Sequence, residues 1–439
     1  MTIGAITLGG ALTSSVAAAD TLSLTQALEM GMQKSPNVRA AKLRTESADA
    51  ATSAARAGYL PRLEAKVFVQ EVGAATDGSA RATVNGPEFA TRSVSYTSTV
   101  PGLSGTLIWN VWDFGKTSNS VAANERFRDA AAATEKETTL SIASSIASSY
   151  LNLFYQERLL DLANATMQSR DKLNAITKGL VKNGIQPPME EIRAGSRLEA
   201  ARRDFERAKA GAEDARTQLA LALGLEPSAD LRVTAPRLPR LSMDTATALR
   251  EADDKRPQLA AAKATADGRQ AAKDQQFAQL LPNLFASVNG TLNPDRPDYS
   301  DYVQTRKQFI AQVGLSGAFD FGSLARLDQA SADAAAAEAD LEATRRDTKS
   351  DATRATISVR ATAAQLEHAR KAEEGTQAVR AIVEARYIRG LSSPLELVDA
   401  EDSDIDARQT RIQTELDHAL AIVRLCVAIG RPITEEAAQ

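Results

Sequence analysis

The chain has 439 residues, a formal net charge of −4 and 25% charged residues, so it carries no basic surface suited to nucleic acid. Apolar residues make up 43% of the chain but aromatic residues only 5%, which favours alanine-rich helices that approach each other closely. One cysteine and two histidines exclude an intrachain disulfide framework and a Cys/His metal cage.

Residues 1–19 are predicted to be a secretory signal peptide. The stretch 3–16 is weakly apolar, and three alanines at 17–19 precede Asp20, as at a small-residue cleavage site. The charged start typical of such a leader is missing, because the first basic residue is Lys34. Apolar runs stay shorter than the roughly 18–20 residues of a membrane-spanning helix, so a bilayer crossing is expected to use strands.

The remainder of the chain repeats one plan twice. Matching motifs recur at an offset of 221 residues in the first part of each copy and at 206 in the later part. Chance matches would not keep the same offset across motifs that are far apart. A shorter loop in the second copy accounts for the change of offset. The matched pairs are Pro36 with Pro257 and Pro61 with Pro282 at 221, then Gly184 with Gly390 and Gly224 with Gly430 at 206.

Each copy is predicted to run helix, strand, loop, strand, very long helix, tight tip and long helix. In the first copy Leu63, Ala65 and Val67 alternate with polar residues, and the alternation returns from Leu103 to Val111. This period of two is typical of strands with one apolar and one wet face. The first copy is placed at 20–223, with strands at about 60–72 and 98–112, the long helix at 114–182, the tip at 183–188 and a helix at 189–223.

The second copy follows a linker at 224–243 and shows the same alternation at Leu284, Ala286 and Val288. Polar loops at about 73–97 and 293–307 join the paired strands. The second copy is placed at 244–432, with strands at about 282–292 and 308–319, the long helix at 321–388, the tip at 389–394, a helix at 395–429 and a tail at 433–439.

Two details of the strand–helix junctions stand apart from the repeat. The Asp-Phe-Gly motif at Asp113 matches the one at Asp320 at an offset of 207, one more than its neighbours, which indicates a one-residue bulge. Trp109 and Trp112 fit either a membrane-interface belt or ordinary strand packing. Only one of the two can lie on the apolar face if strict alternation holds.

The long helices carry apolar residues seven apart, which predicts left-handed coiled-coil packing between neighbouring helices. About 67 helical residues at ~1.5 Å rise form a rod on the order of 100 Å. The spaced residues are Ile146, Leu153, Leu160 and Met167, and the first three match Ala352, Val359 and Leu366 in the second copy.

Four strands in lipid would leave two unpaired edges, which the hydrocarbon core does not tolerate. Closure therefore requires several chains, and three chains of four strands give twelve, a plausible barrel size. The predicted fold class is an α+β membrane protein: long α-helical coiled coils forming an α-barrel, with four β-strands per chain in a shared β-barrel.

The second tip, from Arg386 to Glu401, reads RYIRGLSSPLELVDAE. It resembles the periplasmic hairpin tip of TolC-like outer-membrane factors, with a basic-Tyr pair, Gly-Leu-Ser and two acidic residues three apart. With the duplication, the resemblance covers about residues 20–432. It implies a homotrimer in the outer membrane of a Gram-negative bacterium that extends into the periplasm and exports substrates. The implied partners are outer-membrane lipid, a periplasmic adaptor (membrane fusion protein) and an ABC or proton-driven inner-membrane transporter, without cofactor or catalysis.

The same resemblance implies roles for residues at the two tips. Glu396 and Asp399 match acidic residues that ring the narrow entrance, and Tyr387 and Glu190 match a tie between neighbouring hairpins. Ser392 stands where the prototype carries an arginine of the closing network, so the closed state is expected to open more readily. The residues that match adaptor-contacting positions are Gly184, Ile185, Gly390, Leu391 and Ser392.

Alternatives remain at this level. Glu396 and Asp399 also fit a solvated helix face, and Tyr387 a packing aromatic. One alternative is a periplasmic coiled-coil adaptor, which has a single hairpin between small β modules, whereas this chain has two tips and two strand pairs. Another is a fibrous coiled coil without a pore, which needs no strand pairs. The sequence contains no phosphate loop, nucleophile elbow or metal-binding helix.

Three further side chains are assigned structural rather than chemical roles. Cys426 aligns with Ala220 and is predicted to be a small core residue. His368 and His418 lie on polar-rich helices and are predicted to lie at the surface. The cargo, whether drug or protein, is left open because it depends on the inner-membrane partner.

Overall fold

The structure is a computed structural model that describes residues 21–76, 94–227, 231–239, 241, 243–292, 307–317, 321–389 and 391–433. Several predicted features lie outside the described residues: the signal peptide, most of both strand-connecting loops, Asp320, Gly390 and nearly all of the tail.

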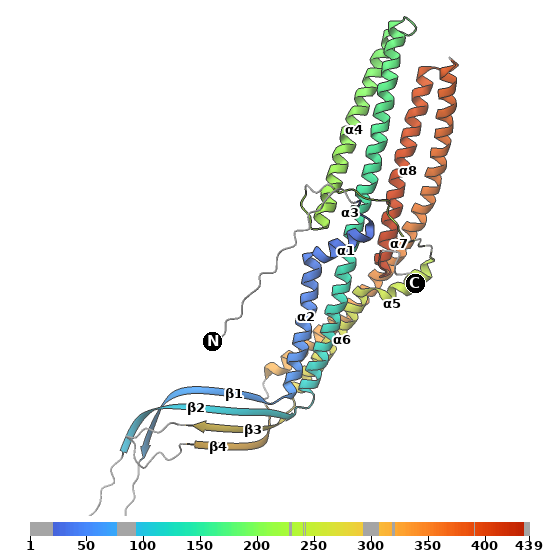
Figure 1. Ribbon diagram of the computed structural model, residues 1–439. Helices are drawn as coiled ribbons and strands as arrows, with labels where there is room; N and C mark the ends of the chain where they lie inside the picture. The colour runs from blue at the N-terminus through green and yellow to red at the C-terminus, as the bar shows by residue number, and fades with distance from the viewer. Residues whose placement is uncertain are drawn as a thin grey trace, which may run out of the picture. The chain divides into compact units, whose positions relative to one another are not determined.

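Figure 1 shows the order of the elements along the chain. Within the described residues, no helix has the length and apolar character needed to cross a membrane. The helices and strands are α1 (Leu24–Lys34), α2 (Pro36–Arg56), a 3₁₀ turn (Ala57–Tyr59), β1 (Arg62–Thr76), β2 (Val94–Trp112), α3 (Lys116–Lys182), α4 (Pro188–Ala222), α5 (Thr245–Lys255), α6 (Pro257–Gln279), β3 (Asn283–Leu292), β4 (Lys307–Ser316), α7 (Phe321–Ile388) and α8 (Pro394–Ala428).

The chain divides into two compact units that cut across the two sequence copies, because each unit takes segments from both. We call them the helical unit and the sheet unit. The helical unit comprises Met1–Arg44, Ala131–Ala262 and Leu341–Gln439, and the sheet unit comprises Thr45–Ala130 and Lys263–Asp340.

The helices begin where the local sequence can satisfy their first backbone N–H groups. Ser23 and Gln26 form a capping box ahead of α1, with each side chain accepting a hydrogen bond from the backbone N–H of the other. The helices α2 and α6 start at Pro36 and Pro257. A proline at the first helical position costs no hydrogen bond, because that N–H has no partner within the helix.

The core of the helical unit confirms the seven-residue pattern in part. Ile146 and Leu153 are buried, as are their counterparts in α7 (Ala352, Val359 and Leu366), whereas Leu160 and Met167 are only half-buried. The fully buried side chains come mainly from the middle of α3 and the ends of α4 and α8. The coiled-coil core is therefore thickest where the four long helices meet the short helix α1.

Two of the structural assignments have different outcomes. Cys426 is fully buried, as Ala220 is, and burial raises the pKa of its thiol to about 11, so it is a core residue. His418 is only partly exposed, and its ring packs with Nδ1 3.0 Å from Thr362 Oγ1. Burial, with a smaller contribution from the charge of Arg370, lowers the pKa of His418 below its usual value.

The first tip shows how the hairpin turns. Gly184 has φ +71°, a left-handed conformation that favours glycine, as the sequence predicts. The N–H of Ile185 donates to Leu180 O at 2.9 Å, closing the end of α3. In the second tip the N–H of Leu391 donates to Arg386 O at 2.9 Å, the same bond displaced by 206 residues.

The sheet unit contains one antiparallel sheet in the order β1-β2-β3-β4. Pairing of β1 with β2 continues from Thr76 opposite Val94 to Arg62 opposite Ile108. The first strand pair thus extends into the segment predicted as loop, because backbone pairing continues beyond residue 72. In the middle of the sheet one row runs across all four strands: Leu63, Leu107, Val288 and Ala311.

The register of β2 against β3 shifts between Asn110 and Trp112, so a bulge does occur near the junction. Trp109 lies opposite Ala286 and Trp112 opposite Leu284, which places both indoles on the apolar face. Strict alternation therefore does not hold at this point of β2, so both tryptophans share one face. This bulge lengthens the first copy, so it does not explain the offset of 207, which requires an extra residue in the second.

The buried hydroxyl of Tyr150 ties the linker after α4 to the segment before α1. It lies 2.8 Å from the carbonyl oxygens of Leu22 and Thr234 and accepts a hydrogen bond from the Thr234 N–H. Replacing Tyr150 by Phe leaves a buried carbonyl without this partner, so we expect the free energy of unfolding to fall by about 1–3 kcal/mol. Thermal melting in detergent measures the loss.

The matched control is Tyr155→Phe. Tyr155 is buried in the same core, and among the described contacts its hydroxyl makes no hydrogen bond. Its replacement is expected to shift the melting temperature much less. Equal shifts for the two variants would show that the Tyr150 hydroxyl does not stabilise the linker.

Candidate functional site

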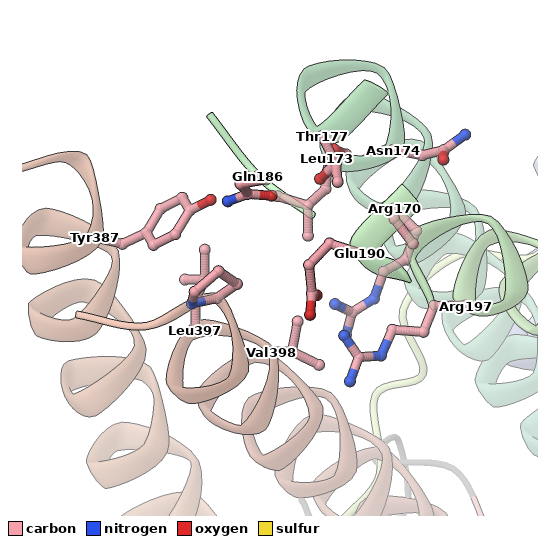
Figure 2. A pocket seen from close by; sticks show the side chains of 12 residues that line it. Arg170, Leu173, Asn174, Thr177, Gln186, Glu190, Arg197, Tyr387, Leu397 and Val398 are labelled. Atoms are coloured by element: carbon pink, nitrogen blue, oxygen red, sulfur yellow. Dashed lines mark hydrogen bonds between the residues drawn. The ribbon is translucent and has the colours of Figure 1, made fainter. Parts of the chain in front are cut away.

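The two tips of the helical unit enclose a pocket between the first hairpin (α3 and α4) and the second hairpin (α7 and α8) (Figure 2). Tyr387 points into this pocket from α7, and Glu190 enters it from the first turn of α4. The structure thus brings together two residues that are almost 200 positions apart in the sequence. The other lining residues include Arg170, Leu173, Gln186, Arg197, Leu397 and Val398.

Glu190 has a local partner in this conformation. Its carboxylate accepts a hydrogen bond from Arg193 Nη1 at 2.8 Å, one turn along α4. Tyr387 is half-buried, and Figure 2 shows its hydroxyl directed toward Gln186. The tie between Tyr387 and Glu190 therefore stays a prediction, although both side chains line the same pocket.

The two acidic residues of the second tip lie in the first two turns of α8. Ser393 caps this helix, because its Oγ accepts from the Glu396 N–H at 3.2 Å. Glu396 and Asp399 are exposed, whereas Leu397 and Val398 between them are buried. The spacing of three residues therefore puts both carboxylates on the free face of α8, where the helix N-terminus favours negative charge.

Ser392 interacts within its own tip. Its hydroxyl donates to the carboxylate of Glu396, one turn into α8. The printed contact of this short side chain therefore stays within the second tip and the start of α8. Ile185 and Leu391, at matching positions of the two tips, are both exposed, and each presents an apolar side chain to solvent.

The sequence analysis missed a buried arginine between the two hairpins. Arg170 of α3 is 5% exposed and donates to Glu401 of α8 at 2.6 Å and to Asp402 at 2.5 Å. Burial raises the pKa of Glu401 above its usual value, and the charge of Arg170 opposes that rise. The only signal in the sequence is that the repeat places Thr376 where the first copy has Arg170.

A second ionic contact joins the same two helices further from the tips. Arg158 of α3 donates to Glu415 of α8, and Glu415 also accepts from Arg411 at 2.8 Å. The guanidinium of Arg158 lies over the rings of Phe154 and Tyr155, 6.0 and 5.8 Å from their centroids. Cation–π contact and the carboxylate together hold this side chain in one place.

The sheet unit has an unusual surface, because its apolar face is exposed. Val67 is 85% exposed, and the polar face instead carries hydrogen bonds such as Asn289 Nδ2 to Thr106 at 2.6 Å. A contiguous exposed apolar face across four strands is typical of contact with lipid or another protein. Its exposed members include Leu63, Val67, Val69, Leu103, Leu107, Trp109, Leu292, Phe309, Val313 and Leu315.

The described residues contain no group of three or more His, Cys, Asp or Glu side chains placed to hold a metal ion. The exposed apolar face of the sheet unit is suited to contact with a membrane, and the exposed apolar side chains at the tips of the helical unit are suited to contact with another protein.

Comparison with known proteins identifies relatives along most of the chain. The family model described as outer membrane efflux protein matches residues 27–225 and 248–431. Nodulation protein T of Rhizobium leguminosarum bv. trifolii is 29% identical over 171 residues, which are 39% of this chain and 34% of that protein. Protein CyaE of Bordetella pertussis is 23% identical over 420 residues, covering 94% of this chain and 85% of that protein.

Solved structures share the fold. The outer-membrane channel OprN superposes with a TM-score of 0.77 at 22% identity, covering 93% of this chain and 89% of that one. The open state of the Neisseria gonorrhoeae MtrE outer-membrane channel gives 0.77 at 19% identity, with 95% and 91% covered. CusC gives 0.76 at 18% identity, with 95% and 96% covered. With the family model matched in both copies, the chain belongs to the outer membrane efflux protein family, whose members are transport channels of the outer membrane and not enzymes.

Proposed function

We propose that three copies of this chain close their sheets into one barrel and form a duct through the outer membrane for export. Channels of this family are trimeric and work with an adaptor and an inner-membrane transporter. The observation that supports the proposal best is the sheet itself: β1 and β4 lie at its edges, and its apolar face is exposed. Lipid accommodates that face only when neighbouring chains pair the two edges.

The entrance of the duct is assigned to the second tip. Glu396 and Asp399 lie on the free face of α8, and threefold symmetry would place six carboxylates around one constriction. Carboxylates concentrated in a narrow opening attract cations and repel anions. A solvated helix face without such a ring would give no ion preference.

The closed state and the adaptor contact are assigned to the tips as well. Tyr387 and Glu190 line one pocket between the two hairpins, which supports a tie between this phenol and this carboxylate. Exposed Ile185 and Leu391 suit an apolar contact with a periplasmic adaptor. Gly184, Gly390 and Ser392 complete the adaptor-contacting set. An inner-membrane transporter, driven by ATP or protons, would select the cargo.

The orientation of the sheet toward lipid is testable with neighbouring residues of β4. Ala311 lies on the apolar face and Gln312 on the polar face, and both are exposed. Ala311→Arg is expected to destabilise membrane assembly by about 2–4 kcal/mol if the residue lies near the bilayer centre, because the charge would enter hydrocarbon. Gln312→Arg is the matched control and is expected to assemble normally in lipid vesicles. Equal assembly of the two variants would place the apolar face away from lipid.

The entrance assignment is testable by ion selectivity in planar bilayers. Glu396→Gln combined with Asp399→Asn removes the charges at nearly constant shape, so relative anion permeation is expected to rise and block by multivalent cations to weaken. The control is Glu199→Gln with Glu206→Gln, the same charge change on exposed residues of α4. A reversal potential that moves equally in both double variants, or in neither, would remove these acids from the constriction.

A further inference from the structure

The outer strands of the sheet carry its most exposed large apolar side chains. Figure 1 shows β1 and β4 at the two sides of the sheet, with β2 and β3 between them. Val67 and Val69 of β1 are 85% and 70% exposed, and Val313 and Leu315 of β4 are 73% and 70% exposed, whereas Leu107 of β2 is 41% exposed. Each edge of the sheet therefore presents large apolar side chains to whatever strand pairs with it.

The internal repeat relates each outer strand to an inner one. The matched prolines that precede β1 and β3 align Ala65 of β1 with Ala286 of β3. Within the two strand pairs, Ala65 lies opposite Gly105 of β2, and Ala286 lies opposite Val313 of β4. Gly105 and Val313 are therefore equivalent positions of the two copies.

The strand–helix junctions support the same alignment. The Asp-Phe-Gly motif begins at Asp113 after β2 and at Asp320 after β4. Counted back from Asp113, β2 contains one extra residue at its bulge. With that residue left out of the count, Gly105 again coincides with Val313. Two separate observations thus give one alignment of β2 with β4.

The repeat also relates the strand pairing between chains to a strand pairing within the chain. The pairing of β2 with β3 joins the first copy to the second. In a closed ring β4 would meet β1 of the next chain, which joins the second copy to the first. The two pairings are therefore equivalent, and they would alternate around the barrel. This step rests on the trimeric duct proposed above.

Two pairs on the apolar face identify the register. Gly105 lies opposite Gly290, and Leu107 lies opposite Val288. Transferred to the outer strands by the alignment, the first pair becomes Val313 with Val69, and the second becomes Leu315 with Val67. Large aliphatic side chains thus replace the two glycines of the inner pairing. Opposed side chains of this kind stabilise strand pairing, and here they would hold together chains that no covalent link joins.

We propose that β4 of one chain pairs antiparallel with β1 of the next in the register that sets Val313 opposite Val69 and Leu315 opposite Val67. A shift by one residue would turn the apolar face of one strand to the polar side. The nearest competing registers are therefore displaced by two residues. They set Val313 opposite Val67 or Leu315 opposite Val69.

Oxidative crosslinking in outer membranes tests this register. In a Cys426→Ala background, one cysteine replaces Val67 or Val69 and another replaces Val313 or Leu315, which gives four double variants. Cβ atoms directly opposite each other lie about 4.5–5.5 Å apart, close to the separation in a disulfide, whereas those displaced by two residues lie about 7–8 Å apart. Copper–phenanthroline is the oxidant, and a one-carbon bis-methanethiosulfonate repeats the assay where strand geometry disfavours a direct disulfide.

The matched pairs are Val69→Cys with Val313→Cys and Val67→Cys with Leu315→Cys. They are expected to run mostly as covalent dimers and trimers on denaturing gels. The displaced pairs, Val67→Cys with Val313→Cys and Val69→Cys with Leu315→Cys, are expected to stay mostly monomeric. Each cysteine occurs in one matched and one displaced pair, so poor folding of one substitution cannot produce this pattern. Oxidised single-cysteine variants are the further control.

Three results would overturn the register: stronger linkage of the displaced pairs, equal linkage of all four variants, or trimers by native mass in which neither reagent links a matched pair. A folded, membrane-extracted protein with the mass of one chain would instead overturn the trimeric duct itself.

Discussion

The hydrogen-bonding groups at the two edges of the four-stranded sheet are the constraint on which the rest of the molecule depends. A sheet that exposes Val67 and Phe309 on one face is suited to hydrocarbon, yet hydrocarbon offers no partner for the free edges of β1 and β4. Both requirements are met together only when other chains supply the missing strands. A membrane position and an oligomeric state therefore have one physical cause.

The helical unit meets a different requirement, because its helices pack through small side chains. Alanines such as Ala147 and Ala215 are fully buried and allow close approach of the helices, but they provide little specificity. Specific pairing of the two hairpins comes instead from buried charge, as at Arg170. The two copies have diverged at these charged positions while retaining the glycine turns and the heptad core.

Much of this architecture could be predicted from periodicity. The alternation from Leu63 onward located the strands, and Gly184 adopts the left-handed turn expected of it. Two features could not be predicted. The position of the bulge, beside Val111 in the first copy, depends on how β2 pairs with a strand from the other copy, and the bulge moves Trp112 to the apolar face. The partners of Arg170 lie more than 230 positions away, and the repeat shows only that the equivalent position holds Thr376, which does not identify those partners.

The most direct test of the central claim is the mass of the assembled particle. Native mass spectrometry of the protein extracted from outer membranes in mild detergent measures how many chains, each of 46.8 kDa before any processing, form the folded unit. The constraint on the sheet edges, with the trimeric assembly of the family, predicts a species of three chains that persists on dilution. A folded, membrane-extracted species of one chain would contradict the account, because its sheet would then tolerate two open edges in lipid.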